Sequence, residues 1–304
     1  MRPDAGLLLV DKPAGATSHD IMLRLRRALG VRRVGHTGTL DPFATGLLLA
    51  LVGAFTRLAD FFHALPKSYE ATLELGRETD TDDLTGVTVS ESRAWRDFEG
   101  ERVRAAFAAR VGKGRQVPSV YSARRVGGER AYDLARRGDR PALEAREVVF
   151  HELTVTEVDL PRVRFRAQVS TGTYVRALAR DIGRDLGAGA HLTALRRTGI
   201  GPFPLAEAVG PEEAADAVTS ALPAWRPGLG ALPWFPQRRL SGREEAEVRN
   251  GRPVGRGDLL PPLWRGLTSA EPEAGPVALV AGDALVAIAE ARDDRLLPRK
   301  VFPA

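Results

Sequence analysis

The strongest constraint on the fold of this chain comes from segments in which apolar and polar residues alternate. In residues 68–75 a tyrosine, an alanine and two leucines alternate with glutamates and a threonine, and residues 162–170 follow the same pattern. Period-two alternation is typical of a strand with one buried face. Residues 148–158 and 162–170 are joined by a short Asp-Leu-Pro connection, which indicates an antiparallel pair. The sequence therefore predicts a mixed, mainly antiparallel sheet, with further strands over residues 6–10 and 47–52.

Helical patterns separate these strands along the chain. Thr17 or Ser18 can cap a helix that runs to about Leu29, and Gly30 ends it. Further short helices are expected over residues 55–62, 98–111, 212–222 and 243–249. We therefore expect an α/β protein with helices flanking the sheet.

One predicted helix, which begins near Thr173, has a basic second side. Its apolar residues repeat every four positions, and Arg176, Arg180 and Arg184 fall opposite them. The ordinary interpretation of such an arginine stripe is a solvated helix face.

Three segments without any period are expected to be loops. Residues 35–46 are rich in glycine, threonine and proline, and residues 77–87 in acidic residues and threonines. Residues 116–141 carry six arginines and form an exposed excursion in our interpretation.

A proline- and glycine-rich break over residues 225–236 divides the chain. The length of 304 residues is enough for about two domains. Beyond the break, two strands over 277–280 and 284–289 flank a Gly-Asp turn, and residues 298–302 suit a last strand. We therefore expect a small β-rich C-terminal module.

The charge of the chain favours an anionic partner. The net charge is +5, and only four of the 44 basic residues are lysines. The guanidinium group of arginine matches phosphate oxygens and stacks on bases, so nucleic acid is the first candidate. A genomic composition bias is the alternative explanation for the excess of arginine.

Several classes of site find no support. The absence of cysteine excludes a thiol nucleophile, a zinc ribbon, an iron–sulfur cluster and disulfides. The five histidines lack metal-ligand spacing, and no phosphate-loop or dinucleotide-binding motif occurs, so we predict no metal and no other cofactor. The longest apolar run, residues 46–55, is shorter than the roughly 20 residues of a membrane span. We therefore expect a cytoplasmic protein without a membrane segment.

The densest group of unusual residues surrounds Asp41. Gly38 and Gly46 let a backbone approach a ligand closely, and Pro42 stiffens the chain beside the carboxylate. Without further information, two interpretations of Asp41 are open: it is a catalytic group, or it is a turn or cap residue with a structural role only.

Five segments, in order, resemble the TruB family of pseudouridine synthases, the bacterial tRNA pseudouridine-55 synthases. Residues 35–48, GHTGTLDPFATGLL, resemble the family signature G-x-(T/S)-G-T-L-D-P-x-A-T-G-x-L, with Phe43 where leucine is common. The other segments resemble the family's N-terminal motif, its K-x-Y-E, its segment with Q-x-P followed by S-A and A-Y, and its G-T-Y-(I/V)-R followed by G-A-H-x-x-x-L-R-R. They lie at residues 11–20, 67–70, 116–132 and 170–197, so the resemblance covers most of residues 7–203.

This resemblance implies an isomerase. The family flips a target uridine out of its RNA, breaks the glycosidic bond, rotates the base and joins C5 to the sugar, without metal or cofactor. For this chain it implies pseudouridine formation at position 55 in the T-loop of tRNA. The implied partner is the T-arm of tRNA, with no protein partner required and a monomeric enzyme.

The resemblance also assigns catalytic roles. Asp41 is implied as the catalytic aspartate, which either attacks C1′ or removes a proton. Arg176 is implied to hold that carboxylate through its planar fork, and Tyr69 to stack on the flipped base and to offer its hydroxyl for proton transfer. Read alone, Arg176 is one more solvated arginine, and Tyr69 is a core residue of an alternating strand.

Three further residues are implied to bind the substrate. His36 is implied to contact the target loop or to fill the gap that the base leaves, and Tyr174 and Leu195 to line the uracil pocket. Read alone, His36 is a polar loop residue, and the other two are core residues on helix faces.

The resemblance implies two domains. Residues 1–232 are implied to form a catalytic domain of the pseudouridine synthase fold, with an RNA-gripping insertion at about 117–147 whose arginines bind phosphates. Arg125 stands where the family commonly has lysine. Residues 237–304 resemble the family's PUA-type RNA-binding barrel in place and size, and a structural cap is the alternative.

Two other functions stay open at this point. Guide-RNA-dependent synthases of archaea and eukaryotes share the aspartate loop, but they need accessory proteins and usually carry an N-terminal extension, whereas this sequence starts directly at its first motif. A non-catalytic tRNA-binding or tRNA-folding protein is the second alternative. The presence of Asp41, Tyr69 and Arg176 argues against it.

Overall fold

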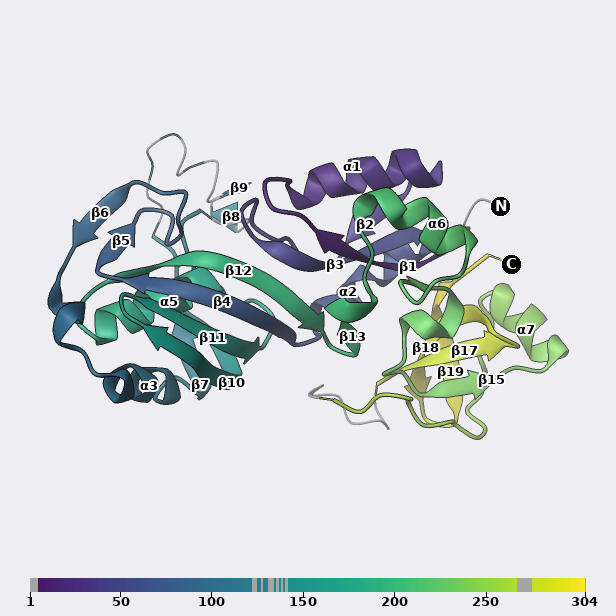
Figure 1. Ribbon diagram of the computed structural model, residues 1–304. Coiled ribbons are helices and arrows are strands. Elements are labelled where there is room, and N and C mark those ends of the chain that lie inside the picture. Colours follow the sequence, from purple (N-terminus) through teal and green to yellow (C-terminus); the bar gives the residue numbers. More distant parts are fainter. Residues whose placement is uncertain are drawn as a thin grey trace. The chain divides into compact units, whose positions relative to one another are not determined.

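The computed structural model describes residues 5–121, 142–266 and 275–303, together with residues 125, 126, 128–130, 134, 137 and 139. The chain forms two compact units (Figure 1). The first consists of Met1–Pro42, Gly46–Leu65 and Gly199–Ala304, and the second of Phe43–Thr45 and Pro66–Thr198.

The first unit is built on strands that are buried on both faces. β1 (Ala5–Lys12) pairs antiparallel with β3 (Thr45–Gly53), and Leu7 lies opposite Leu51. Both leucines are fully buried. Continuous apolar runs are typical of strands covered on both sides, which explains why neither strand shows alternation. Both strands confirm the prediction.

A short strand stands where the sequence predicts only loop. β2 (Val34–His36) pairs antiparallel with β3, so that His36 lies opposite Ala50. Three residues beside glycines carry no alternation, and the strand exists because β3 supplies its partner. The loop prediction for residues 35–46 is therefore wrong at its start, and the loop itself spans residues 37–44. The other short strands of this sheet in the first unit are β13 (Phe203–Pro204) and β14 (Trp225–Arg226).

Helix α1 (Ser18–Leu29) has the boundaries that the sequence predicts. The Thr17 hydroxyl accepts a hydrogen bond from the Asp20 amide at 3.1 Å, and the Asp20 carboxylate accepts one from the Thr17 amide at 2.9 Å. This reciprocal pair is a capping box. Gly30 ends the helix with a φ of 63°, which glycine adopts without steric strain. The apolar face of the helix packs into the core of the unit.

Two predicted helices of the first unit each begin with a 3-10 turn. η1 (Ala54–Leu58) continues into α2 (Ala59–His63), and η4 (Pro211–Glu213) continues into α6 (Ala214–Thr219). The predictions are confirmed in position, although the first turn of each segment is a 3-10 helix and α6 ends three residues before the predicted end at residue 222. Isolated 3-10 turns are η3 (Leu205–Glu207) and η5 (Gly228–Ala231).

The C-terminal part of the first unit forms a curled five-stranded half-barrel (Figure 1). In spatial order its strands are β15 (Gln237–Arg239), β17 (Pro276–Ala281), β18 (Ala284–Arg292), β19 (Arg295–Val301) and β16 (Val254–Gly255). The hairpin β17–β18 and the last strand β19 confirm the predicted pattern. Helix α7 (Gly242–Arg249), capped by Ser241, confirms the predicted helix of this module.

The C-terminal strands share one apolar core with the N-terminal strands. Phe302 belongs to the same buried cluster as the leucines of β1 and β3. Its ring meets that of Phe55 edge-on, with centroids 5.6 Å apart, and Arg57 donates a hydrogen bond to the Val301 carbonyl at 2.7 Å. The boundary between a catalytic and an RNA-binding domain stays a prediction.

The second unit holds the strands with the alternating pattern. Its sheet has the order β12 (Ala190–Ile200), β4 (Lys67–Leu75), β11 (Arg162–Val169), β10 (Arg146–Asp159) and β7 (Gly112–Gln116). β11 pairs antiparallel with both β4 and β10, as predicted. β7 is an additional edge strand that the sequence does not predict. Its residues, Gly-Lys-Gly-Arg-Gln, include no large apolar side chain and therefore show no alternation.

The buried face of this sheet is the predicted one. Leu73 lies opposite Val163, and both side chains are fully buried. Helix α3 (Gly100–Ala108) covers this face through Phe107, whose ring centroid lies 4.9 Å from that of Phe165. Helix α5 (Val175–Asp185) starts two residues after the predicted position.

A hairpin replaces part of the polar loop predicted over residues 77–87. β5 (Arg77–Thr79) pairs antiparallel with β6 (Thr88–Glu91), and residues 80–87 form the turn between them. Every side chain of β6 is exposed, so no alternation marks the strand. The remaining elements of the unit are η2 (Ala94–Asp97), β8 (Arg125–Val126) and β9 (Glu129–Arg130).

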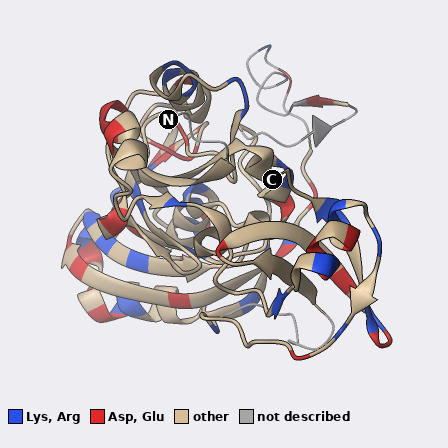
Figure 2. Cartoon of the chain, turned by 90° about the vertical axis from the view of Figure 1, so that its right-hand side faces the viewer, with Lys and Arg blue, Asp and Glu red and all other residues tan. Residues whose placement is uncertain are grey.

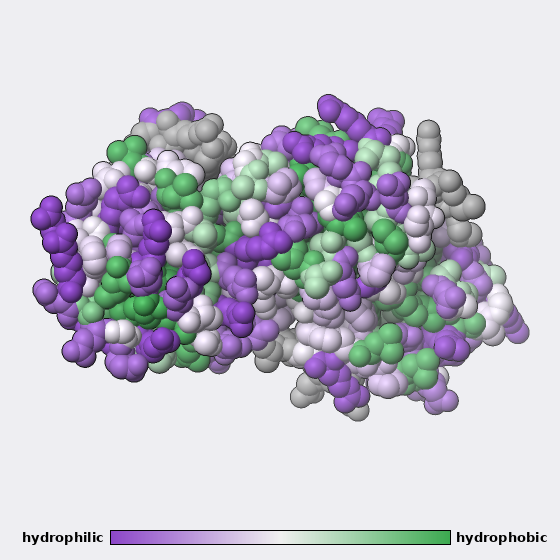
Figure 3. All heavy atoms as spheres, in the orientation of Figure 1, coloured by the Kyte–Doolittle hydropathy of each residue, from purple (hydrophilic) through white to green (hydrophobic). Residues whose placement is uncertain are grey.

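Basic and acidic residues are interspersed along the strands (Figure 2), and hydrophilic residues cover much of the face shown in Figure 3. Arg166 of β11 forms an ion pair with Glu70 of β4 at 3.1 Å, and Arg164 forms one with Glu157 of β10 at 2.8 Å. Such exposed pairs contribute about 0–1 kcal/mol each. Some of the arginines therefore form ion pairs with carboxylates of the same chain. Within the described ranges, no helix is long and apolar enough to cross a membrane.

Candidate active site

The loop that carries Asp41 is anchored from the N-terminal segment of the first unit. The ammonium group of Lys12, which is fully buried, donates hydrogen bonds to the carbonyls of Ala16 at 2.7 Å, Pro13 at 3.0 Å and Pro42 at 3.3 Å. The Gly15 amide donates a second bond to the Pro42 carbonyl, at 2.8 Å. The residue after Asp41 is therefore held by two donors.

The residue before Asp41 is held by helix α1. The Ser18 hydroxyl, nearly fully buried, accepts a hydrogen bond from the Leu40 amide at 2.9 Å and lies 3.3 Å from the Leu40 carbonyl, to which it also donates. Asp41 itself is half-buried. Because both of its neighbours are fixed, the backbone that presents this carboxylate is rigid. The sequence predicts the stiffness from Pro42 alone, and the structure adds Lys12 and Ser18.

His36 lies at the start of the same loop. It is half-buried at the end of β2, and its Nδ1 accepts a hydrogen bond from the Gly38 amide at 3.3 Å. Since Nδ1 accepts this bond, it carries no proton in this arrangement. The interpretation of His36 as a loop residue is wrong by one position, because it is the last residue of a strand.

The remaining predicted site residues belong to the second unit. Tyr69 lies on β4 opposite Ala167 of β11 and is half-buried, on the face that also buries Leu73. The strand pattern predicts a buried core residue at this position, whereas the side chain of Tyr69 is partly exposed to solvent.

Leu195 lies on β12 and not on a helix, so its interpretation as a helix-face residue is wrong. Leu195 lines a groove of about 540 Å³. The apolar lining includes Phe43 and Leu84, and the charged lining includes Glu70, Arg164 and Arg166. Leu84 is 46% exposed, so this apolar area is open to solvent.

Tyr174 immediately precedes helix α5 as its N-cap, in an extended conformation. Its amide donates to the side-chain oxygen of Gln116 at 2.9 Å, and its carbonyl accepts from the Gln116 side-chain nitrogen at 3.1 Å. Gln116 thus fixes the backbone on both sides of Tyr174, and the tyrosine is half-buried outside the helix. Its interpretation as a helix-face core residue is wrong.

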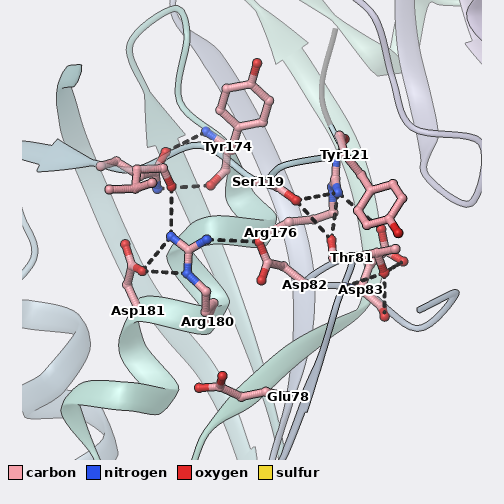
Figure 4. A network of polar contacts seen from close by, with 12 residues as sticks. Glu78, Thr81, Asp82, Asp83, Ser119, Tyr121, Tyr174, Arg176, Arg180 and Asp181 are labelled. Carbon is pink, nitrogen blue, oxygen red and sulfur yellow. Dashed lines mark hydrogen bonds and ion pairs between the residues drawn. The ribbon is translucent and has the colours of Figure 1, made fainter. Parts of the chain in front are cut away.

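Arg176 is buried in a polar network, with 3% of its surface exposed (Figure 4). Its guanidinium donates to the Thr81 carbonyl at 2.7 Å, the Ser119 hydroxyl at 3.1 Å and the Tyr121 carbonyl at 2.8 Å. It also forms an ion pair with Asp83 across 3.5 Å, and both side chains are almost fully buried. The interpretation of Arg176 as a solvated helix-face arginine is wrong.

Arg180 is buried in the same way, and Arg184 is not. Arg180 forms ion pairs with Asp82 at 3.1 Å and Asp181 at 2.8 Å. Arg184 forms a two-bond pair with Glu78, and 59% of its side chain is exposed. The basic stripe of the helix therefore faces the acidic segment that follows β4.

Burial and charge move the pKa values of several groups in this unit. Burial raises the pKa of Asp82 above its ordinary value, against the opposing charges of Arg180 and Arg176. A hydrogen bond from Arg184 lowers the pKa of Glu78. Burial, with added repulsion from Arg197, lowers the pKa of Lys67 to about 7.

Sequence reasoning missed Asp82, Asp83, Ser119 and Tyr121 as parts of this network. The available signal was the acidic run of residues 78–83, whose charge is opposite to that of the arginine stripe on the later helix. Among the described residues, no group of three or more histidine, aspartate or glutamate side chains is arranged to hold a metal ion. Twelve of the 31 residues of the predicted RNA-gripping insertion, and the side chain of Arg125, lie outside the described residues.

Two family models match residues of both units. The N-terminal domain of the TruB family of pseudouridylate synthases matches residues 26–175, and the C-terminal domain of tRNA pseudouridylate synthase B matches residues 176–222. A tRNA pseudouridine synthase B of Thermobifida fusca is 44% identical over 306 residues, which cover 98% of each chain. A protein of the same name from Geobacter sulfurreducens is 42% identical, with 84% of each chain covered.

Two solved structures share the fold. An archaeal box H/ACA sRNP Nop10–Cbf5 complex has a TM-score of 0.71 at 23% identity and covers 99% of this chain and 87% of that chain. A Cbf5–Nop10–Gar1 complex has a TM-score of 0.73 at 24% identity, with 99% and 85% covered. The expected pseudouridine synthase fold is confirmed. With the full-length identity to the bacterial relatives, these matches establish that the chain belongs to the TruB family of pseudouridylate synthases.

Proposed function

We propose that this protein converts a uridine of tRNA to pseudouridine, at position 55 in the T-loop. The observation that carries the proposal is the 44% identity, over 98% of the chain, to a protein named tRNA pseudouridine synthase B. The anchored loop around Asp41 supports it, because a reaction at a single ribose carbon needs a carboxylate held in one place.

The reaction is an isomerisation, so no atom is gained or lost. The bond between N1 of uracil and C1′ of the ribose breaks, the base rotates, and C5 bonds to C1′. The proton on C5 leaves, and N1 takes up a proton. No electron is transferred, so this reaction class needs no oxidant or reductant. Flipping the nucleotide costs a few kcal/mol, less where the base already lies in a loop.

The catalytic roles follow the family motifs. Asp41 acts at the ribose of the flipped nucleotide, as nucleophile or as base, and Tyr69 stacks on the base. Arg176 holds the catalytic carboxylate and balances its charge. The support for Arg176 is that its guanidinium is fixed by two carbonyls and a hydroxyl before any substrate binds.

Substrate contacts come from three further residues. His36 contacts the target loop or fills the gap that the flipped base leaves, and Tyr174 and Leu195 line the uracil pocket. Two observations support this assignment: Leu195 opens onto a groove, and Tyr174 is half-buried outside its helix on a backbone that Gln116 holds.

RNA binding extends beyond the flipped nucleotide. The insertion at about 117–147 grips the T-arm through its arginines, and the module at 237–304 acts as a PUA-like RNA-binding domain. The curled five-stranded sheet of this module supports the second assignment. We further propose that the enzyme acts as a cytoplasmic monomer on tRNA without a protein partner.

A guide-RNA-dependent enzyme is the second candidate, because the solved complexes of this fold include one described as an H/ACA RNP bound to a substrate RNA. At 22% identity that likeness concerns the fold alone. The relatives at 42–44% identity carry the name tRNA pseudouridine synthase B, which favours the stand-alone enzyme.

The test uses the purified protein and an unmodified tRNA transcript labelled with tritium at C5 of uridine. Release of tritium without guide RNA or added protein is the expected result. A transcript with cytidine at position 55 is the control and releases none. No release from the uridine transcript refutes the proposed function, and release only with a guide RNA favours the second candidate.

A further inference from the structure

Helix α5 presents three arginines, one turn apart, to three carboxylates of the segment after β4. Arg176 meets Asp83, Arg180 meets Asp82, and Arg184 meets Glu78. The order along the segment is the reverse of the order along the helix, so the two run side by side in opposite directions. Figure 4 shows the surroundings of Arg176 and Arg180.

Arg180 occupies the centre of this arrangement and is bonded on every side. Nη1 donates to Asp82 at 3.1 Å, Nη2 donates to the Val117 carbonyl at 2.8 Å, and Nε donates to Asp181 at 3.0 Å. Only 9% of Arg180 and 7% of Asp82 are exposed. One planar guanidinium therefore joins the turn after β5, the segment after β7 and its own helix, which a lysine ammonium cannot do with the same geometry.

The two segments that Arg180 joins are those that supply the acceptors of Arg176. Asp82 lies between Thr81, whose carbonyl accepts from Arg176, and Asp83, its ion-pair partner. Val117 lies two residues before Ser119, the third partner. If either segment moves, the acceptors of Arg176 move with it.

The backbone at Asp82 needs such support. Its φ is 61°, a left-handed conformation that is strained for a residue with a side chain. The Asp82 carbonyl accepts a hydrogen bond from the Leu192 amide at 3.0 Å, which ties the turn to β12. The Arg180 ion pair holds the side chain of the same residue.

We propose that Arg180 is a positioning residue for uridine isomerisation: it holds the 81–83 turn and the 117–121 segment where they fix the guanidinium of Arg176. This inference rests on the proposed function. It assigns Arg180 no contact with the RNA, so loss of its geometry lowers kcat and leaves the KM for tRNA unchanged.

The matched variants are Arg180→Lys and Arg184→Met. Arg180→Lys keeps the charge and removes the fork, so the fold is retained. Arg184→Met removes an arginine–carboxylate pair of the same helix at an exposed position. We expect Arg180→Lys to lower kcat at least tenfold with KM within twofold, and Arg184→Met to change neither. Arg180→Met, if it folds, has an equal or larger effect on kcat.

A second measurement does not depend on activity. Amide hydrogen exchange, followed on peptides that cover residues 79–87 and 116–121, is faster in Arg180→Lys than in the wild type and unchanged in Arg184→Met. A wild-type kcat in Arg180→Lys overturns the inference, as does a tenfold rise in KM or unchanged exchange in both peptides. An inactive wild type instead refutes the proposed function, and the inference falls with it.

Discussion

The ammonium group of Lys12 lies 3.3 Å from the carbonyl oxygen of Pro42, although thirty positions separate the two residues in the chain. The same nitrogen donates to the carbonyls of Pro13 and Ala16. The N-terminal motif and the aspartate loop are thus two parts of one structure, in which a buried cation holds the turn beside the carboxylate of Asp41.

Replacing this cation loosens the loop. Lys12→Met removes a donor from three carbonyls, of which Pro42 keeps the Gly15 amide and Pro13 belongs to an exposed residue. Loss of the buried bond to the Ala16 carbonyl costs about 1–3 kcal/mol. We therefore expect the free energy of unfolding to fall by about 1–3 kcal/mol, and kcat to fall more than KM rises. Urea unfolding and steady-state kinetics measure both. Lys113→Met, at an exposed position of β7, is the control; equal effects of the two variants would contradict the anchoring role.

The catalytic role of Asp41 is tested by an isosteric change. Asp41→Asn keeps the shape of the side chain and removes the charge that acts at the ribose. We expect tRNA binding within twofold of the wild type and a fall in tritium release of at least about a hundredfold. Asp60→Asn, at an exposed carboxylate of α2, leaves both unchanged. Conversion at a normal rate by Asp41→Asn rules out the assigned role.

Arg176 also stabilises the fold. Its partner Asp83 is 95% buried at the side chain, so Arg176→Met leaves a buried carboxylate without that countercharge. Breaking one side of a buried pair destabilises a protein by about 3–5 kcal/mol. Arg166→Met breaks the exposed pair with Glu70 and costs less than about 1 kcal/mol. Urea unfolding of both variants separates them, and equal losses would refute the buried pair as a stabilising contact.

Lys67 makes stability depend on pH. Its folded-state pKa of about 7 lies below its ordinary value of 10.5, so above pH 7 the unfolded chain binds more protons than the folded chain. Stability therefore rises with pH between about 7 and 10 through this group. Lys67→Met is expected to gain stability relative to the wild type below pH 7, and the gain shrinks as the pH rises. A pH-independent difference in urea unfolding between pH 6 and 9.5 would show that the pKa is not lowered.

Binding of tRNA is expected to weaken with salt. Each phosphate that an arginine neutralises contributes to a linear fall of log K with log salt concentration, with a slope of about −0.7 to −0.9 per contact. Filter binding of the Asp41→Asn variant between 50 and 300 mM salt measures the slope without turnover. A binding constant that barely changes with salt argues against arginine–phosphate contacts.

The alternating strands and capped helices were predictable because their signals are local. The period of β4 and β11, the Thr17 cap and Gly30 need no knowledge of distant residues. β2 and β6 were not predicted because their formation depends on residues that are distant in the sequence. Each is short, and each exists because another strand supplies its hydrogen-bond partners.

The same distinction applies to the site. Asp41, Tyr69 and Arg176 were assigned to the candidate site through motifs, but the buried surroundings of Arg176 were not predicted. The arginine stripe of α5 and the acidic run after β4 are each visible in the sequence, and each by itself is typical of a solvated surface. About ninety-five positions separate Arg176 from Thr81, and nothing local indicates that the two segments meet.

The contacts of the C-terminal residues have a practical consequence for dissecting RNA recognition. Phe302 sits against Phe55, and Val301 accepts a hydrogen bond from Arg57. A truncation near residue 236 exposes the apolar core that β1 and β3 share with the C-terminal strands. Loss of function in such a fragment can therefore result from unfolding as well as from lost affinity for RNA. Charge substitutions on the outer faces of the half-barrel are the cleaner probe.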